Sequence, residues 1–405
     1  MTAANRTAET YRREWRLFME EICCNLLRFY HAEQDNIPPE RVKVNQEVSL
    51  GTDGSFADIC IRVPDRPAYY VEVKPDYAPE ELLSVLVRKY GPNAPLAEPI
   101  SKVLLVAGTD ARQSRPDIED WLKAALRPGL ALEIWDESKI QAEIRARFHC
   151  DIATLSEKNI LELRAAIDQA KGRHAFGETW TGDLLQSALL WHFGFWRLRD
   201  IHEKSGRDAR AICPPGMYRD VAVIMADLCS FSSFVRDTRD DDVVRQCLTS
   251  FYSKARYEIL NTGGMMYQFV GDEVIGLYGL PDQSAGYVED ALECARRLLE
   301  IGNSISHEWQ RQIDRVQQTK GVHVGTAVGD LQIVSLRPFG RAHLGAISDC
   351  VNMAARLLAA AGANEIVASN SFYKGLTKSK QSRFQELESI DAKNVGKIKA
   401  WKSTP

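Results

Sequence analysis

The stretches VAVIMADLCSFSSF (221–234) and MMYQFVGDEVIGLYG (265–279) decide the fold of the C-terminal half of the chain. In each, a run of strand-forming apolar residues leads to an aspartate, Asp227 or Asp272, and a short turn with more apolar sequence follows. This pattern predicts two carboxylates side by side at the ends of neighbouring strands. Adjacent carboxylates repel each other unless a cation lies between them. Oxygen ligands favour Mg²⁺ or Mn²⁺, which keep coordination positions for substrate phosphate, so the pair predicts a metal-dependent phosphate site.

The length and composition indicate a soluble chain of more than one domain. The 405 residues exceed one ordinary domain, and 45% hydrophobic with 26% charged residues is typical of globular proteins. A net charge of −4 argues against tight nonspecific binding to nucleic acid. Nine scattered cysteines without a CxxC motif favour a reducing compartment. The N-terminus lacks a signal-peptide core and no apolar run is long enough to span a bilayer, so we expect a cytoplasmic protein without membrane insertion.

Periodicity predicts three segments. Residues 1–150 form an α/β domain, residues 151–216 a helical connector and linker, and residues 217–405 an α+β domain. In this last domain we expect an antiparallel-rich sheet with helices on one face. The α/β domain is expected to contain helices at 9–31, 78–92 and 116–126 and strands at 43–50, 56–63, 68–74, 101–108 and 130–136.

A helix expected at 351–361 narrows the chemistry of the C-terminal domain. Asn352 and Arg356 are spaced i and i+4 and therefore lie on one helical face. An asparagine can hold a ribose oxygen, and an arginine can stabilise charge that develops on a phosphate. Lys393 adds a cation for a polyphosphate tail. Together with two metal ions these groups suit in-line attack at the α-phosphate of a nucleotide.

Residues 218–402 resemble the class III nucleotide cyclases. The similar motifs are YRDVAVIMADLCSFSSF, GGMMYQFVGDEVIGLYG, LGAISDCVNMAARL and AKNVGKIKAW. The resemblance implies two Mg²⁺ or Mn²⁺ ions in each site and a nucleoside triphosphate substrate. It also implies these roles: metal ligands at Asp227, Asp272 and the Leu228 carbonyl; ribose orientation by Asn352; α-phosphate stabilisation by Arg356; triphosphate binding by Lys393; and a phosphate loop at Phe231 and Ser232.

The resemblance also implies a homodimer. In this family the metal carboxylates and the Asn/Arg pair of one site come from opposite subunits. Because this chain has one set of these residues, two copies are expected to form two composite sites.

The chain departs from the family at the positions that read the base. Purine-specific members usually have lysine where this chain has Gln268, and adenylate cyclases usually have Asp or Thr where it has Gly345. Beside Tyr267, Gln268 can donate to O4 of uracil and accept from N3–H. The sequence thus resembles the bacterial pyrimidine cyclases of anti-phage Pycsar systems, which make cyclic UMP or cyclic CMP to activate an effector. We expect conversion of UTP to cyclic UMP, with adenylate and cytidylate cyclase activity as the alternatives.

In the N-terminal domain, a hairpin is expected to bring Asp58 beside Glu72 and Lys74, which share one strand face. Residues 9–140 resemble the PD-(D/E)xK nuclease-like fold, with Phe-Ala-Asp at 56–58 in place of the usual Pro-Asp. These residues are compatible with a metal site, with DNA cleavage and with an exposed charged pair. A sensor domain is the most economical role. The alternative of another class is a nuclease-like protein that senses nucleic acid and carries a regulatory or inactive cyclase domain.

Overall fold

The computed structural model describes residues 3–52, 54–238, 240–313, 319–336, 343–387, 390–392 and 396–403. The chain separates into two compact units, Met1–Thr179 and Trp180–Pro405. The segment expected to be a connector is shared between them. Helix α6 (Ile160–Phe176) belongs to the first unit, whereas α7 (Leu184–His192), α8 (Phe195–Ser205) and α9 (Ala209–Ile212) belong to the second. The domain boundaries at residues 150 and 216 stay a prediction.

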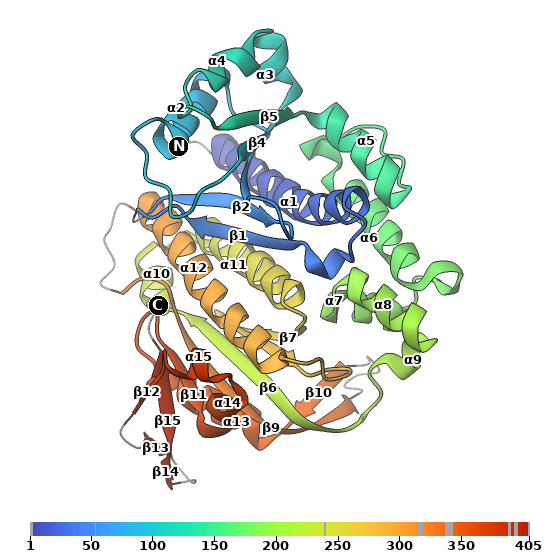
Figure 1. Ribbon diagram of the computed structural model, residues 1–405, viewed down its shortest axis with the longest axis vertical. Coiled ribbons are helices and arrows are strands. Elements are labelled where there is room, and N and C mark those ends of the chain that lie inside the picture. Colours follow the sequence, from blue (N-terminus) through green and yellow to red (C-terminus); the bar gives the residue numbers. More distant parts are fainter. Residues whose placement is uncertain are drawn as a thin grey trace. The chain divides into compact units, whose positions relative to one another are not determined.

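The first unit contains a five-stranded sheet in the order β1-β2-β3-β4-β5 (Figure 1). The pairs β1/β2 and β2/β3 are antiparallel, and β3/β4 and β4/β5 are parallel. The strands are β1 (Lys43–Ser49), β2 (Phe56–Arg62), β3 (Tyr69–Lys74), β4 (Lys102–Ala107) and β5 (Ala131–Trp135). The helices are α1 (Ala3–Gln34), α2 (Pro79–Tyr90), α3 (Thr109–Ser114), α4 (Ile118–Lys123) and α5 (Glu137–Phe148), together with α6.

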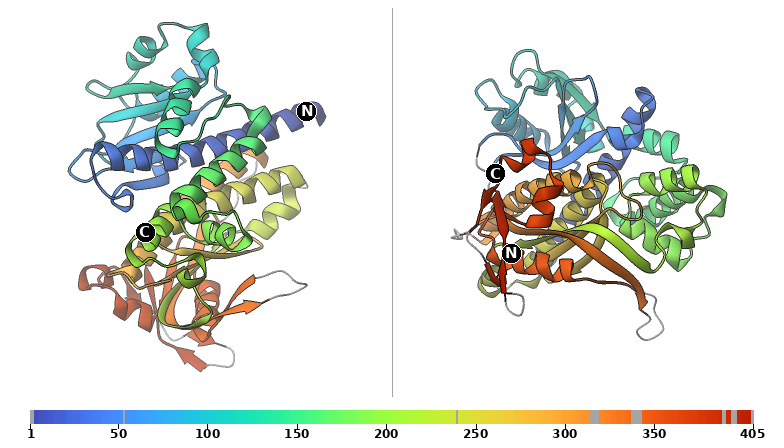
Figure 2. Two further views of the ribbon diagram at one scale, coloured as in Figure 1. Left: turned by 90° about the vertical axis from the view of Figure 1, so that its right-hand side faces the viewer. Right: turned by 60° about the horizontal axis from the view of Figure 1, so that its bottom comes forward.

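Helix α1 is the amphipathic helix that the sequence predicts, and it runs along one face of this sheet (Figure 2). Its apolar side chains Trp15, Ile22 and Leu26 are buried. Helices α2 and α4 contribute Leu86 and Leu122 to a core that also includes inward-facing residues of β2 to β5. Apolar burial on both faces explains why β3 and β4 read as nearly continuous hydrophobic runs.

The second unit is built on a mixed sheet in the order β12-β15-β11-β9-β6-β8-β7, with β10 also paired to β9. All pairings in this sheet are antiparallel except β11 with β9, within the part of the chain that the structure describes. The central strands are β6 (Gly216–Leu228), β7 (Met265–Val270), β8 (Glu273–Tyr278), β9 (Val322–Leu336) and β10 (His343–Ile347). The others are β11 (Ile366–Ser369), β12 (Gln385–Glu386) and β15 (Ala400–Ser403), and a separate pair joins β13 (Ile390–Ala392) to β14 (Gly396–Ile398).

Helices lie on both faces of this sheet, so the expectation of helices on one face is wrong. They are α10 (Phe231–Thr238), α11 (Asp241–Asn261), α12 (Tyr287–Ile313), α13 (Asp349–Ala360), α14 (Asn370–Gly375) and α15 (Lys378–Gln381). Gly276 of β8 faces α11 and pairs with Ile224 of β6. The next residue of β6, Met225, pairs with Gly325 of β9, which faces α13. Successive strand residues point to opposite faces, so α11 and α13 cover opposite faces.

Helices α11 and α12 pack against each other and are among the long helices in Figure 1. Even so, no helix among the described residues is both long enough and apolar enough to cross a membrane.

Candidate active site

The two aspartates meet at one end of the central strands. Asp227 is near the end of β6, where it pairs with Glu273 of β8 and His323 of β9. Asp272 lies in the tight turn between β7 and β8, directly after Gly271, whose φ of +63° suits a residue without a side chain. The Asp227 carboxyl group lies close enough to that of Asp272 to raise its pKa. The β6/β8 pairing thus brings together residues that are far apart in the sequence.

Crowded negative charge marks this site. Burial and the neighbouring Asp227 carboxylate raise the pKa of Asp272 to about 7. The same two causes raise the pKa of Glu273. A divalent cation would remove this repulsion, and partly buried carboxylate oxygens are the ligands that Mg²⁺ and Mn²⁺ prefer. The donor set therefore fits the two-metal expectation, although the described residues contain no cluster of three or more His, Cys, Asp or Glu side chains arranged to hold a metal ion.

Sequence reasoning missed the histidine beside the aspartates. His323 Nε2 lies 3.2 Å from Asp227 Oδ2, and its Nδ1 lies 3.5 Å from the Sγ of Cys229. The hydrogen bonds to Asp227 and Cys229 raise the pKa of His323 to about 10. A polar residue within the apolar strand GVHVGTAV is a signal that could have identified it.

Helix α13 presents Asn352 and Arg356 away from its own sheet. Apolar residues form its buried side. The helix begins after Ser348, whose side chain accepts a hydrogen bond from Cys350 N and caps the helix. Asn352 is exposed and Arg356 partly buried. Both side chains are thus accessible to a second molecule.

Strand β7 contains an irregularity that determines where Gln268 lies. The register shifts between Met266 and Gln268, so that Gln268 rather than Tyr267 pairs with Ile275. Ile275 pairs with Met225, and by alternation Asp227 lies on the same sheet face as Met225. A β-bulge of this kind redirects side chains beside functional sites. Gln268 is partly exposed on that face.

Tyr267 joins β7 to β10. Its hydroxyl accepts a hydrogen bond from the backbone N–H of Ala346 at 2.9 Å. The preceding residue, Gly345, is buried and pairs with Val334 of β9. The contact fixes the β10 backbone at Gly345 relative to the strand that carries Gln268.

The remaining predicted residues of the second unit have different surroundings. Phe231 is buried and its ring lies 6.1 Å from that of Trp309, so only its backbone is available to a phosphate. Ser232 is exposed in the first turn of α10, and the side chain of Leu228 is buried at the end of β6. Lys393 lies outside the described residues.

In the first unit, Asp58, Glu72 and Lys74 come together beneath α2, with two residues that sequence reasoning missed. Lys74 donates to Asp58 and lies 3.2 Å from Glu72 Oε2. Lys89 Nζ lies 2.7 Å from the same oxygen, and the Tyr90 hydroxyl donates to Glu72 Oε1 at 2.5 Å. All five side chains are buried.

The ammonium groups of Lys74 and Lys89 pair with the carboxylates of Asp58 and Glu72 in this cluster. Burial opposes the ionisation of Asp58, but Lys74 and Lys89 outweigh it and lower its pKa to about 2. On β1, between the residues that pair with Ile59 and Ala57, Glu47 has a φ of +51°, a conformation that costs a residue with a side chain roughly 1–2 kcal/mol. Such strain often occurs at functional sites. The cluster is a closed charge network, and a nuclease role for it stays a prediction.

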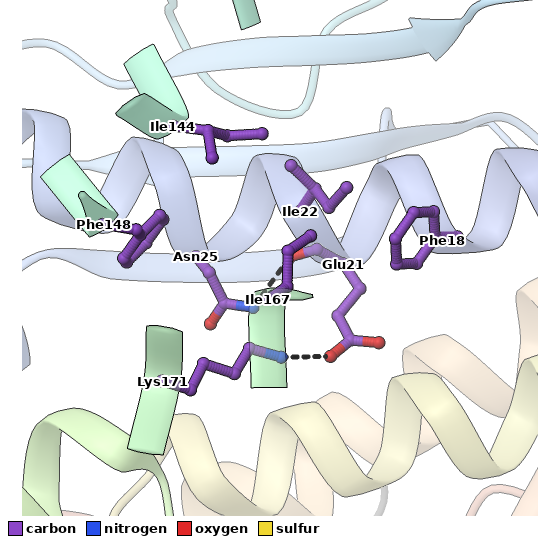
Figure 3. Close-up of a pocket in the computed structure, with 8 residues that line it drawn as sticks. All are labelled: Phe18, Glu21, Ile22, Asn25, Ile144, Phe148, Ile167 and Lys171. Atoms are coloured by element: carbon purple, nitrogen blue, oxygen red, sulfur yellow. Dashed lines mark hydrogen bonds and ion pairs between the residues drawn. The ribbon is translucent and has the colours of Figure 1, made fainter. Parts of the chain in front are cut away.

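A small cavity lies where α1, α5 and α6 meet in the first unit (Figure 3). Its volume is about 20 Å³. The lining is mainly apolar, and the ion pair between Lys171 and Glu21 at 3.0 Å lies beside it. A space of this size holds about one water molecule, so it is a packing gap and too small for a nucleotide.

Residues 214–402 match the family model of the adenylate and guanylate cyclase catalytic domain. The chain is also similar in structure to three solved cyclases. The guanylyl cyclase Cya2 has 17% identity and a TM-score of 0.42, over 47% of this chain and 94% of that one. The adenylyl cyclase CyaB from P. aeruginosa has 18% identity and a TM-score of 0.41, over 47% and 96%. The guanylate cyclase domain of RhGC from Catenaria anguillulae, solved with GTP, has 19% identity and a TM-score of 0.37, over 46% and 97%. No curated protein sequence matches the chain.

Proposed function

We propose that the protein, whose residues 214–402 match the family model of the adenylate and guanylate cyclase catalytic domain, is a uridylate cyclase that converts UTP to cyclic UMP and pyrophosphate. The observation that carries this proposal is that Asp227 and Asp272 meet at one end of the central strands, with Gln268 on the same sheet face as Asp227. The carboxylates supply the metal chemistry, and the glutamine supplies the preference for the base.

Asp227 and Asp272 would hold the divalent ions, together with the Leu228 carbonyl. Bound there, two ions would activate the ribose 3′-hydroxyl and neutralise the triphosphate charge. The 3′-oxygen attacks the α-phosphorus, its proton passes to water, and the bond from the α-phosphorus to the bridging oxygen breaks. Arg356 would stabilise the charge on the α-phosphate and Asn352 would orient the ribose, each donating hydrogen bonds that strengthen in the transition state. Lys393, Ser232 and the Phe231 backbone would bind the leaving pyrophosphate.

Gln268 would recognise the base through hydrogen bonds to one of its edges. A glutamine amide can donate to O4 of uracil and accept from N3–H at the same time. In cytosine these two positions have the opposite hydrogen-bonding character, so the amide would have to be rotated by half a turn to pair with it. Gly345 has no side chain to read a base edge, and its position relative to β7 is held by Tyr267 through Ala346. A site that hydrogen-bonds a substrate group discriminates strongly against analogues that lack it.

A homodimer would complete each site. Asn352 is exposed and Arg356 partly exposed on the outer side of α13, whereas the buried side of this helix packs on its own sheet. In a symmetric dimer the same surfaces serve both protomers, so two copies would form two equivalent sites.

The product would act as a second messenger on a downstream effector in bacterial anti-phage defence, the role that the Pycsar resemblance implies. The first unit would then be the sensor. The net charge of −4 argues against tight nonspecific binding to nucleic acid, which favours a binding module over a nuclease.

A four-substrate assay tests the proposed reaction. Purified protein is incubated with ATP, GTP, CTP or UTP and Mn²⁺, and products are identified by mass spectrometry. We expect cyclic UMP and pyrophosphate in equal amounts from UTP. Preferential conversion of ATP overturns the pyrimidine assignment, and the absence of any cyclic nucleotide from wild-type protein overturns the cyclase assignment.

Variants of Gln268 test the base contact. Gln268→Ala should lower kcat/KM for UTP by about 100-fold or more, because buried polar groups of the base lose their partner. The matched control is Gln332→Ala, which removes an exposed glutamine from β9. Equal activity of Gln268→Ala and the control refutes the recognition role.

The role of the first unit is tested separately. Full-length protein is incubated with linear and supercoiled DNA and Mg²⁺, next to the Lys74→Ala variant. We expect no cutting by either protein. Reproducible cleavage that Lys74→Ala abolishes identifies a nuclease instead.

A further inference from the structure

A hydrogen-bonded chain reaches the Asp227 carboxylate from the neighbouring strand. Both ring nitrogens of His323 have a partner: Nε2 lies 3.2 Å from Asp227 Oδ2, and Nδ1 lies 3.5 Å from Cys229 Sγ. We propose that His323 is a positioning residue that, held by Cys229, orients the metal-binding carboxylate of Asp227. This inference rests on the proposed function, since it assigns a residue to the same site.

The backbone fixes the place of His323. Asp227 and His323 lie opposite each other in the β6/β9 ladder, and the N–H of Cys229 donates to the carbonyl of Gly321 at 2.9 Å. Gly321 has a φ of +89°, and a Cβ at this position would come within 2.0 Å of Asn364 Oδ1. Its own N–H donates to Ser306 Oγ at 2.8 Å. These contacts therefore fix the turn that leads into β9, and the turn in turn fixes the position of the His323 imidazole.

The contact with His323 gives the two oxygens of the Asp227 carboxylate different surroundings. Oδ2 of Asp227 faces His323, so the contact holds the metal-binding carboxylate in one orientation. Without the imidazole, nothing on β9 would hold the carboxylate between Asp272 and Glu273, which both carry the same charge when ionised. Outer-shell partners of metal ligands act in this way, and their loss typically weakens metal binding about 10- to 100-fold.

A general-base role is the competing explanation for a histidine at this place. A base must contact the hydroxyl that it deprotonates, whereas both nitrogens of His323 contact protein groups. The two explanations differ in a measurable way. A positioning residue changes metal affinity and can be replaced by another hydrogen-bond donor, whereas a base changes the rate at saturating metal and cannot.

The test is a Mn²⁺ titration of the full-length protein, with free Mn²⁺ measured by electron paramagnetic resonance in the absence of nucleotide. His323→Ala should raise the Mn²⁺ dissociation constant by about 10- to 100-fold. His323→Gln should stay within about threefold of wild type, because its amide N–H can replace Nε2–H as the donor. His202→Ala, which removes a histidine bonded to the Arg207 carbonyl, should bind Mn²⁺ like wild type.

Kinetics provide the second readout. The loss of activity in His323→Ala should be largely recovered at saturating Mn²⁺, and that in His323→Gln should be slight throughout. Wild-type Mn²⁺ affinity in His323→Ala overturns the inference. So does a rate loss that saturating Mn²⁺ leaves unchanged in both His323 variants.

Asp227→Ala distinguishes this inference from the proposed function. If Asp227→Ala loses Mn²⁺ binding and His323→Ala does not, only the positioning role is wrong. If Asp227→Ala binds Mn²⁺ like wild type, the metal site of the proposed function is itself wrong. Circular dichroism and thermal melting of each variant separate a local effect from unfolding.

Discussion

Gly325 of β9 faces the backbone of α13, the helix that carries Asn352 and Arg356, so Gly325→Ala tests how the position of α13 determines the proposed activity. A Cβ at this residue would lie 2.2 Å from the carbonyl oxygen of Ala354 and 2.4 Å from the backbone nitrogen of Leu358. Both are main-chain atoms within α13, so no side-chain rotation can relieve the clash. To restore an ordinary contact of 3.4 Å, the helix must recede by about 1.2 Å, the difference between 3.4 and 2.2 Å.

A displacement of this size has two expected effects. Overpacking costs about 1–3 kcal/mol, which for a unit of this length lowers the melting temperature by about 2–12 °C. It also shifts Asn352 and Arg356, and a 1 Å misplacement of catalytic groups can cost about 100-fold in rate. The fall in kcat should therefore exceed any rise in KM for the nucleotide.

Product formation by mass spectrometry and thermal melting of the full chain measure these effects. The matched control is Gly216→Ala at the start of β6, where a Cβ would meet no atom within 4 Å. It should melt and turn over like wild type. Wild-type kcat in Gly325→Ala at temperatures below its melting transition would refute the argument, because it would mean that the placement of α13 on the sheet does not control the reaction.

Three further predictions follow from other contacts. Asp227→Ala and Arg356→Ala should each be inactive alone. An equal mixture should recover about a quarter of wild-type activity in a product assay, because half of the dimers are then mixed and each mixed dimer contains one intact composite site. No recovery after subunit exchange contradicts the composite site. Lys89→Ala should destabilise the first unit by about 3–5 kcal/mol, since it leaves buried Glu72 with one ammonium partner fewer. In contrast, Arg145→Ala breaks an exposed pair and should cost about 1 kcal/mol or less; hydrogen exchange of peptides from the first unit measures both, and equal protection in the two variants contradicts the buried-network argument. Tyr267→Phe should leave the Ala346 N–H without its acceptor and lower the free energy of unfolding by about 1 kcal/mol. It should also lower the ratio of UTP to CTP turnover. An unchanged product ratio argues against a link between β10 and base selection.

Most elements of secondary structure could be predicted from local sequence. Periodicity gave α1, the β2/β3 hairpin and the β7/β8 pair, because strands alternate and helices repeat over distances of a few residues. Sequence patterns could not predict the second helical layer on the far face of the second sheet. The cause is Gly325, whose missing side chain lets α13 pack closely, and the sequence around it does not reveal which face it occupies.

For the site, the sequence by itself indicated the proposed chemistry: two carboxylates after apolar strands, Asn352 and Arg356 one helical turn apart, and Gln268 near the second carboxylate. Which groups meet was decided only by the tertiary structure. The β6/β9 register brings His323 to Asp227 from 96 residues away, a bulge at Tyr267 turns Gln268 to the face of the aspartates, and α2 places Lys89 beside Glu72. Strand register and helix docking follow from contacts between distant segments, which no local pattern contains.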